Sequence, residues 1–229
     1  MRFASAASRV LAAVTAGRLC AAALDVAGAM ERAKPSTKQC SGTQDGGGDE
    51  CRTAAQAAPH IVDSFRAHNI SCVQEAACLV SLMLLESAGL QFKHNVSPSP
   101  GVLGQGTANM QSPKFNLLYA KDVVAKLPDD LANATDADGL GKSQKAAMMA
   151  LVTQDNLNFA SAAWFHKTQC ADQAVKAKLR DGGLDGCGDY LQTCVGTKKD
   201  DPSRVALNEQ VYKEMGVDSA QQCVPLWEC

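Results

Sequence analysis

Glu86 stands at the end of the most apolar stretch of the chain, and a glycine-rich loop without acidic residues follows it. A carboxyl group at the C-terminal end of a buried helix experiences desolvation and the negative end of the helix dipole, and both effects raise its pKa. A carboxyl group that holds its proton near neutral pH can act as a general acid. The sequence therefore predicts that Glu86 is a catalytic acid.

The loop behind Glu86 offers neutral hydrogen-bonding groups. Its amide and hydroxyl side chains could bind a polar ligand such as a sugar, and its glycines allow the backbone to approach that ligand closely. The candidate binding residues are Gln105, Gly106, Thr107, Asn109 and Gln111, together with Ser87, which could orient the acid. No Asp or Glu occurs between Glu86 and Asp122, so the sequence shows no second carboxylate close to the proposed acid.

Each candidate also has an ordinary structural interpretation. Glu86 could be a helix-terminal surface carboxylate, and the glycine-rich loop could be a simple tight turn. Tyr119 and Trp164 could contact a ligand or fill the core, and the sequence leaves both alternatives open, whereas Phe159 is expected in the core. His94 could touch a ligand, although an isolated loop histidine is more often simply solvated.

Three short motifs carry a resemblance to a known superfamily. They are Glu86-Ser87 at a helix end, Asn95-Val96-Ser97-Pro98, and Asn109-Met110-Gln111-Ser112-Pro113. Their order and residue types resemble the motif series of soluble lytic transglycosylases and goose-type lysozymes. The aromatic, alanine-rich stretch at 159–165 is similar to a helix of this superfamily and of plant-type chitinases. The spacing from Glu86 to Gln111 is longer than in that superfamily, and either Gln105 or Gln111 could occupy its glutamine position.

The resemblance implies a fold and an activity. The expected fold is a mainly α, lysozyme-like helical domain with a substrate groove. The expected activity is cleavage of β-1,4-linked N-acetylated sugars in peptidoglycan or a chitin-like polymer, by hydrolysis or transglycosylation, with Glu86 as the single acid and no metal or organic cofactor. The residues expected to contact the glycan are Ser87, Gln105, Gly106, Thr107, Asn109, Gln111, Tyr119 and Trp164. The alternative is a non-catalytic secreted protein of the same fold that binds glycans or host molecules.

The apolar periodicity predicts a mainly α-helical domain. The expected helices span 52–67, 72–86, 114–127, two consecutive helices within 143–168, and 204–215. Residues 72–86 are apolar around most of the helix circumference, so we expect this helix at the centre of the core. Long alternating β patterns are missing.

The charge balance argues against nucleic acid and membrane partners. The chain has 22 Lys+Arg against 24 Asp+Glu, and its pI is near 6.1. No basic field is therefore expected to attract phosphate backbones. No segment beyond the N-terminal region offers the roughly 18 consecutive apolar residues that a bilayer span needs.

Ten cysteines without zinc-ligand spacing predict disulfides and a secreted protein, in the extracellular space or the cell wall. We expect residues 1–23 to be a signal peptide, 24–50 a polar linker or pro-segment, and 51–229 the folded domain. Signal cleavage would remove Cys20 and leave nine cysteines, so one thiol is expected to be free or paired with another chain. Sequons at Asn69, Asn95 and Asn133 are compatible with a secreted glycoprotein.

Overall fold

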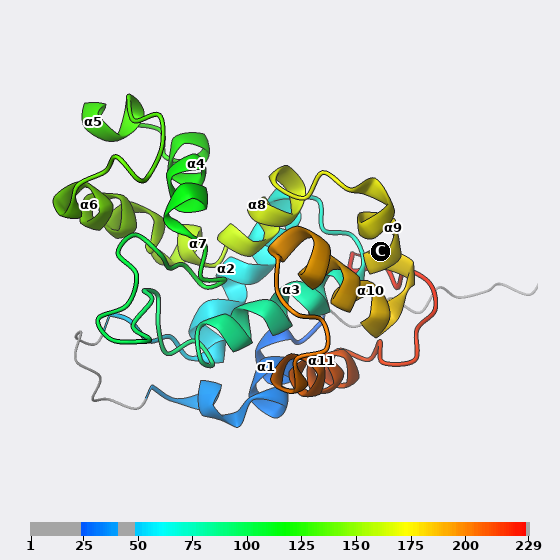
Figure 1. Ribbon diagram of the computed structural model, residues 1–229. Coiled ribbons are helices and arrows are strands. Elements are labelled where there is room, and N and C mark those ends of the chain that lie inside the picture. Colours follow the sequence, from blue (N-terminus) through cyan, green and yellow to red (C-terminus); the bar gives the residue numbers. More distant parts are fainter. Residues whose placement is uncertain (1–23, 41–48, 228–229) are drawn as a thin grey trace, which may run out of the picture.

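Helices pack around one central helix in the part of the chain that the computed structural model describes, residues 24–40 and 49–227. The elements in chain order are α1 (Val26–Ala33), the 3-10 turn η1 (Pro35–Lys38), α2 (Ala54–Ala67), α3 (Val73–Glu86), α4 (Pro113–Val123), α5 (Asp129–Ala132), α6 (Lys142–Val152), α7 (Asp155–Asn158), α8 (Ser161–Thr168), α9 (Gln173–Asp181), α10 (Gly183–Tyr190), the π-helical turn η2 (Leu191–Val195) and α11 (Pro202–Glu214). Figure 1 shows α3 in the middle, with α1 and α11 below it in this view and α9 and α10 at one side.

Buried apolar side chains form two clusters. The larger cluster surrounds α3, whose residues from Val73 to Leu84 are all buried, and includes parts of α1, α2 and α8 to α11. The smaller cluster joins α4, α5, α6 and α8. Helix α8 contributes Ala162 and Ala163 to the first cluster and Trp164 and Phe165 to the second. This one helix therefore holds the two clusters together.

The prediction of a mainly α-helical, disulfide-stapled protein is confirmed. Helical elements cover more than half of the described residues, and the only β pairings among these residues are isolated bridges. Four disulfides join Cys40 to Cys51, Cys72 to Cys223, Cys78 to Cys187 and Cys170 to Cys194. They are compatible with the predicted secretion. None of the helices in the described ranges is long and apolar enough to cross a bilayer.

Some predictions concern residues outside the described ranges. The signal peptide expected at residues 1–23 lies outside them. Cys20 and Cys229, on which the expectation of an odd thiol depends, also lie outside them. The signal peptide and the odd thiol therefore stay predictions.

The segment 24–50, where composition predicts a linker or pro-segment, contains a packed helix. Asp25 caps α1 by accepting a hydrogen bond from the Gly28 amide at 2.8 Å. Val26, Ala29 and Met30 then join the larger core cluster. The polar composition behind the linker prediction starts only after α1 has ended, so α1 belongs with the folded part of the chain.

Helix α10 is one that apolar periodicity does not reveal. Its sequence GLDGCGDY contains three glycines, which disfavour a helix in isolation. One of them, Gly186, allows close packing against α9: a Cβ atom on Gly186 would lie 2.1 Å from the Lys178 carbonyl oxygen and 3.1 Å from the Leu179 Cα. The disulfide between Cys187 and Cys78 also ties α10 to α3. Tertiary packing therefore overrides the local preference.

We predict that Gly186→Ala lowers the free energy of unfolding by about 1–3 kcal/mol, because the added methyl group collides with the backbone of α9. Urea denaturation measures this change. Gly139→Ala is the control, since its added Cβ would have its nearest neighbour at 3.5 Å, and it should stay within about 0.5 kcal/mol of the parent protein. Equal stability of Gly186→Ala and the parent would contradict this account of α10.

A buried carboxylate lies at the start of the central helix. Glu75 Oε2 accepts hydrogen bonds from the amides of Ser71 and Cys72, each at 3.1 Å, and Oε1 lies 3.5 Å from His166 Nε2. Burial alone raises the pKa of Glu75, but the interactions with His166 and the two amides outweigh burial and lower the pKa below the ordinary value of 4.5. Glu75 therefore contributes stability above about pH 4.5, and this contribution is lost as pH falls through the lowered pKa.

Glu75→Gln should reduce the free energy of unfolding at neutral pH by about 1–3 kcal/mol, because the charged acceptor of these hydrogen bonds is lost. The difference from the parent should shrink as the pH falls below the ordinary glutamate range. Thermal unfolding at a series of pH values checks both points. Glu209→Gln, a change at an exposed glutamate of α11, is the control. A stability difference that stays constant down to strongly acidic pH would argue against an ionised Glu75.

Candidate functional site

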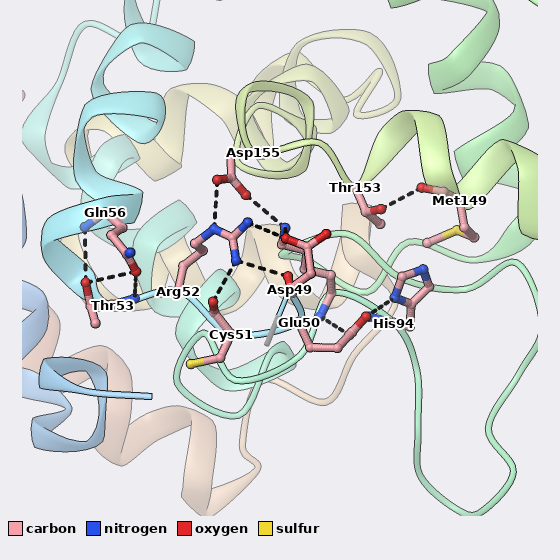
Figure 2. A network of polar contacts seen from close by, with 11 residues as sticks. Asp49, Glu50, Cys51, Arg52, Thr53, Gln56, His94, Met149, Thr153 and Asp155 are labelled. Atoms are coloured by element: carbon pink, nitrogen blue, oxygen red, sulfur yellow. Dashed lines mark hydrogen bonds and ion pairs between the residues drawn. The ribbon is translucent and has the colours of Figure 1, made fainter. Parts of the chain in front are cut away.

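A cleft of about 810 Å³ opens between three segments that are far apart in sequence. Its wall consists of residues 49–52 before α2, residues 92–105 of the long loop after α3, and residues 145–155 of α6 and the start of α7. This volume lies within the range of small-molecule sites. Part of the wall carries charged side chains, which Figure 2 shows, and another part is apolar.

Arg52 organises the charged wall. Its Nε donates a hydrogen bond to Asp155 Oδ2 at 2.7 Å, and its Nη2 donates to Asp49 Oδ1 at 2.7 Å. Nη1 donates to the backbone carbonyl oxygens of Asp49 and Cys51. Thr53, the next residue, caps α2 by accepting from the Gln56 amide. The planar guanidinium thus holds the start of α2 against the start of α7 (Figure 2).

Lys93 adds a second cation to this network. Its Nζ lies 2.9 Å from Asp155 Oδ1, and its side chain is only 5 % exposed. Burial alone raises the pKa of Asp155, but hydrogen bonds from Arg52 and Lys93 outweigh burial and hold the pKa below the ordinary 3.8. The hydrogen bond from Arg52 likewise lowers the pKa of Asp49. At neutral pH two cations therefore face two carboxylates, and the network is close to neutral as a whole.

Glu50 and His94 form a second polar pair in the wall. Glu50 Oε1 lies 2.6 Å from His94 Nδ1, and Oε2 accepts from the backbone amides of Lys93 and His94 at 3.0 and 3.2 Å. Burial alone raises the pKa of Glu50, but the bonds from His94 and these amides outweigh it, so the pKa is lowered. An ionised carboxylate can only accept hydrogen bonds, so Nδ1 of His94 carries a hydrogen. Figure 2 shows the other ring nitrogen pointing away from Glu50.

The apolar part of the wall includes exposed side chains. Val96, Val102 and Leu103 line the cleft and are 45 %, 49 % and 53 % exposed. Met149 of α6 contributes a buried apolar surface on the opposite segment. Exposed apolar side chains that gather in one place mark ligand or partner surfaces more often than scattered ones do. The cleft therefore combines an apolar rim with a polar wall in which Arg52 and Lys93 pair with Asp49 and Asp155.

A second cavity of about 290 Å³ contains the residue predicted to be the acid. Glu86 lines it together with Gln105, Asn109 and Gln111, so the structure brings these four candidates together. Glu86 also forms an ion pair with Arg204 of α11, which the sequence gave no reason to expect. Arg204 Nη1 and Gln111 Oε1 are buried without a hydrogen-bond partner among the described residues.

The loop candidates are mostly occupied inside the protein. Thr107 is fully buried and its Oγ1 lies 3.0 Å from Asn109 Oδ1, which also accepts from Ser161 of α8 at 2.6 Å. Gln111 Nε2 donates to Asn116 Oδ1 at 3.0 Å. Gly106 permits a close backbone approach, but to another part of the protein: its Cβ would lie 2.3 Å from the Lys93 carbonyl oxygen. These groups hold the loop against α4 and α8.

The remaining candidates are buried as well. Ser87 donates to the Met83 carbonyl at 2.6 Å and accepts from the Leu90 amide at 2.8 Å, so it closes the end of α3. Tyr119 is fully buried and donates to a backbone carbonyl of α7. Trp164 is 2 % exposed and donates to Asp122 at 2.6 Å. Of the two alternatives for these aromatic residues, the structure shows the core, and the expected core position of Phe159 is confirmed.

Sequence reasoning did not identify the wall of the larger cleft. Glu50, Arg52 and Lys93 were not candidates, and His94 was considered only as a loop histidine. Residues 52 and 155 are 103 positions apart and residues 50 and 94 are 44 apart. No local spacing signals such contacts, because they depend on how the helices pack.

Comparison with known proteins gives a different relationship from the motif resemblance. No family model matches the chain, and no solved structure matches it significantly. A stretch of 142 residues is 40 % identical to a protein of Fusarium oxysporum (strain Fo5176) named bifunctional dioxygenase (DOX)-epoxy alcohol synthase (EAS). The match covers 62 % of this chain and 11 % of that protein. The chain thus corresponds to only a small part of the relative's length.

The predicted membership of the lysozyme-like superfamily is wrong, because the relative bears the name of an oxygenase. The predicted glycan-cleaving function and its glycan-binding alternative are contradicted by the same relative. The motifs were short and made of common residues, and most of their polar groups bond within the protein. The structure does not test a catalytic role of Glu86 or the expected absence of cofactors and nucleic acid partners, and these stay predictions.

We predict that Asp155→Asn destabilises the protein by about 1–3 kcal/mol, because Arg52 and the buried Lys93 lose a charged hydrogen-bond partner. Urea denaturation at neutral pH provides the measurement. The lowered pKa of Asp155 means that its contribution is present above about pH 3.8 and is lost as pH falls further. The gap between variant and parent should therefore narrow in acid.

The matched control for this change is Asp63→Asn. Asp63 pairs with Arg66 at 3.3 Å, but the two side chains are 74 % and 61 % exposed. Exposed pairs contribute little, so this variant should lose less than about 1 kcal/mol. Equal effects of the two substitutions would show that the network in the cleft wall is no more important than a surface pair.

Proposed function

We propose that this protein is a small-molecule-binding module whose ligand is an apolar molecule that carries oxygen substituents. The observation that carries the proposal is the cleft of about 810 Å³ with its apolar rim and its internally paired polar wall. A site of this kind buries the hydrocarbon part of a ligand and fixes its orientation through a few polar groups.

The distribution of charge narrows the ligand class. Arg52 and Lys93 are both paired with Asp155, and Glu50 is paired with His94. A strongly charged ligand head would have to break these pairs, at the cost of leaving an unpaired, partly buried charge. Neutral oxygen groups such as hydroxyls can bond to the wall without disturbing these pairs. The paired wall therefore favours a neutral oxygenated ligand.

The relative supports the same class of ligand. Its name states that it is a dioxygenase and an epoxy alcohol synthase. An epoxy alcohol carries a hydroxyl group and an epoxide oxygen on a carbon skeleton. Because the matched stretch is 11 % of that protein, we propose a ligand-binding role for this chain in such chemistry rather than the oxygenase reactions themselves. We also propose that the protein works outside the cell or in the cell wall, where its disulfides are stable.

The test is equilibrium binding of a long-chain epoxy alcohol, measured by isothermal titration calorimetry. Val102→Ser should weaken binding about threefold, because a half-exposed apolar side chain that the ligand would cover is lost. Val205→Ser is the matched control: Val205 is 38 % exposed on α11 and does not line the cleft. Its affinity should equal that of the parent.

Two results would overturn the proposal. One is the absence of measurable binding to the folded parent protein. The other is an equal loss of affinity in Val102→Ser and Val205→Ser, which would place the ligand outside the cleft.

A further inference from the structure

His94 is a wall residue of the larger cleft with a ring nitrogen that is free to bond to a ligand. His94 lines the cleft, and its side chain is 40 % exposed. Nδ1 is committed to Glu50 at 2.6 Å. No hydrogen bond from the described chain reaches Nε2, which points away from Glu50 in Figure 2. The charged groups of Asp49, Arg52, Lys93 and Asp155 bond to one another.

The pairing with Glu50 fixes the chemistry of Nε2. Since Nδ1 holds the hydrogen that faces the carboxylate, the neutral ring carries its free lone pair on Nε2. A carboxylate partner of this kind also fixes the ring orientation, as it does for histidines in metal sites and catalytic triads. Nε2 is therefore a preset hydrogen-bond acceptor in the wall of the cleft.

We infer that His94 selects ligands with a hydroxyl group, because its Nε2 accepts a hydrogen bond from that hydroxyl. This inference rests on the proposed function and adds the group that the site recognises. An alcohol can donate to Nε2, whereas an ether or a plain hydrocarbon chain cannot. The site distinguishes an alcohol from its own methyl ether by this one bond.

The geometry allows this role to be separated from a structural one. Glu50 holds the loop through the backbone amides of Lys93 and His94 as well as through the imidazole. These two backbone bonds remain when the side chain of His94 is removed. His94→Ala is therefore expected to fold and to keep the shape of the cleft, which thermal unfolding verifies.

The experiment compares the binding of two ligands to two proteins, the parent and His94→Ala, by titration calorimetry at about pH 8. The ligands are a long-chain secondary alcohol and its methyl ether. The parent protein should bind the alcohol about fivefold more tightly than the ether, which is the effect of one net hydrogen bond. His94→Ala should bind the two ligands equally well, and its affinity for the ether should match that of the parent.

His68→Ala is the matched control. His68 also has its Nδ1 bonded, to the Ser64 carbonyl oxygen at 2.9 Å, but it lies outside the cleft. This variant should keep the full preference for the alcohol.

The outcomes separate the two proposals. If the parent binds neither ligand, the proposed function fails and this inference fails with it. If both ligands bind and His94→Ala keeps the preference for the alcohol, the role of His94 is overturned while the binding function stands. Loss of the preference in His94→Ala together with its retention in His68→Ala supports the inference.

Discussion

The ion pair between Arg52 and Asp155 is the constraint on which the larger cleft depends. It joins Arg52, two positions before α2, to the first residue of α7, across 103 positions of sequence. Lys93 bonds to the same carboxylate, so the loop after α3 is held at the same point. Three segments with no local reason to meet are fixed by one carboxylate and two cations. Partly buried charges of this kind are stable only when each has its partner, which makes the arrangement specific as well as strong.

The character of the cleft follows from this pairing. Because Arg52 and Lys93 pair with Asp49 and Asp155, this part of the wall presents little net charge to a ligand. The apolar rim of Val96, Val102 and Leu103 is therefore expected to contribute most of the binding. Glu50 and His94 are also bonded to each other, but this bond uses only Nδ1 of the imidazole and leaves Nε2 available. The wall thus offers a directional polar contact beside a hydrocarbon surface. That combination matches the oxygenated, largely apolar ligand that we propose.

The second cavity shows how a short motif can mislead. Glu86, Gln105, Asn109 and Gln111 do line one space, as their order in the sequence predicted. The prediction treated the loop as a set of free hydrogen-bonding groups. In the structure Thr107 donates to Asn109, which also accepts from Ser161, and Gln111 donates to Asn116. It also treated the carboxylate as isolated, whereas Arg204 of α11 pairs with it. The residue types were those of a sugar site, yet their bonds hold the loop to the core.

The sequence by itself determined the helical architecture, the central position of α3 and the presence of disulfides. These features follow from the period of apolar residues and from composition, which are local properties of the chain. The tertiary structure alone decided the pairing of the cysteines, the helix α10, the partner of Glu86 and the larger cleft. Glycine-rich α10 exists because its backbone packs closely against α9 and is tied to α3 by a disulfide. The contacts of Arg52, Glu50 and Glu86 reach partners 103, 44 and 118 positions away. Such contacts are set by the packing of whole helices, so no spacing within the sequence predicts them.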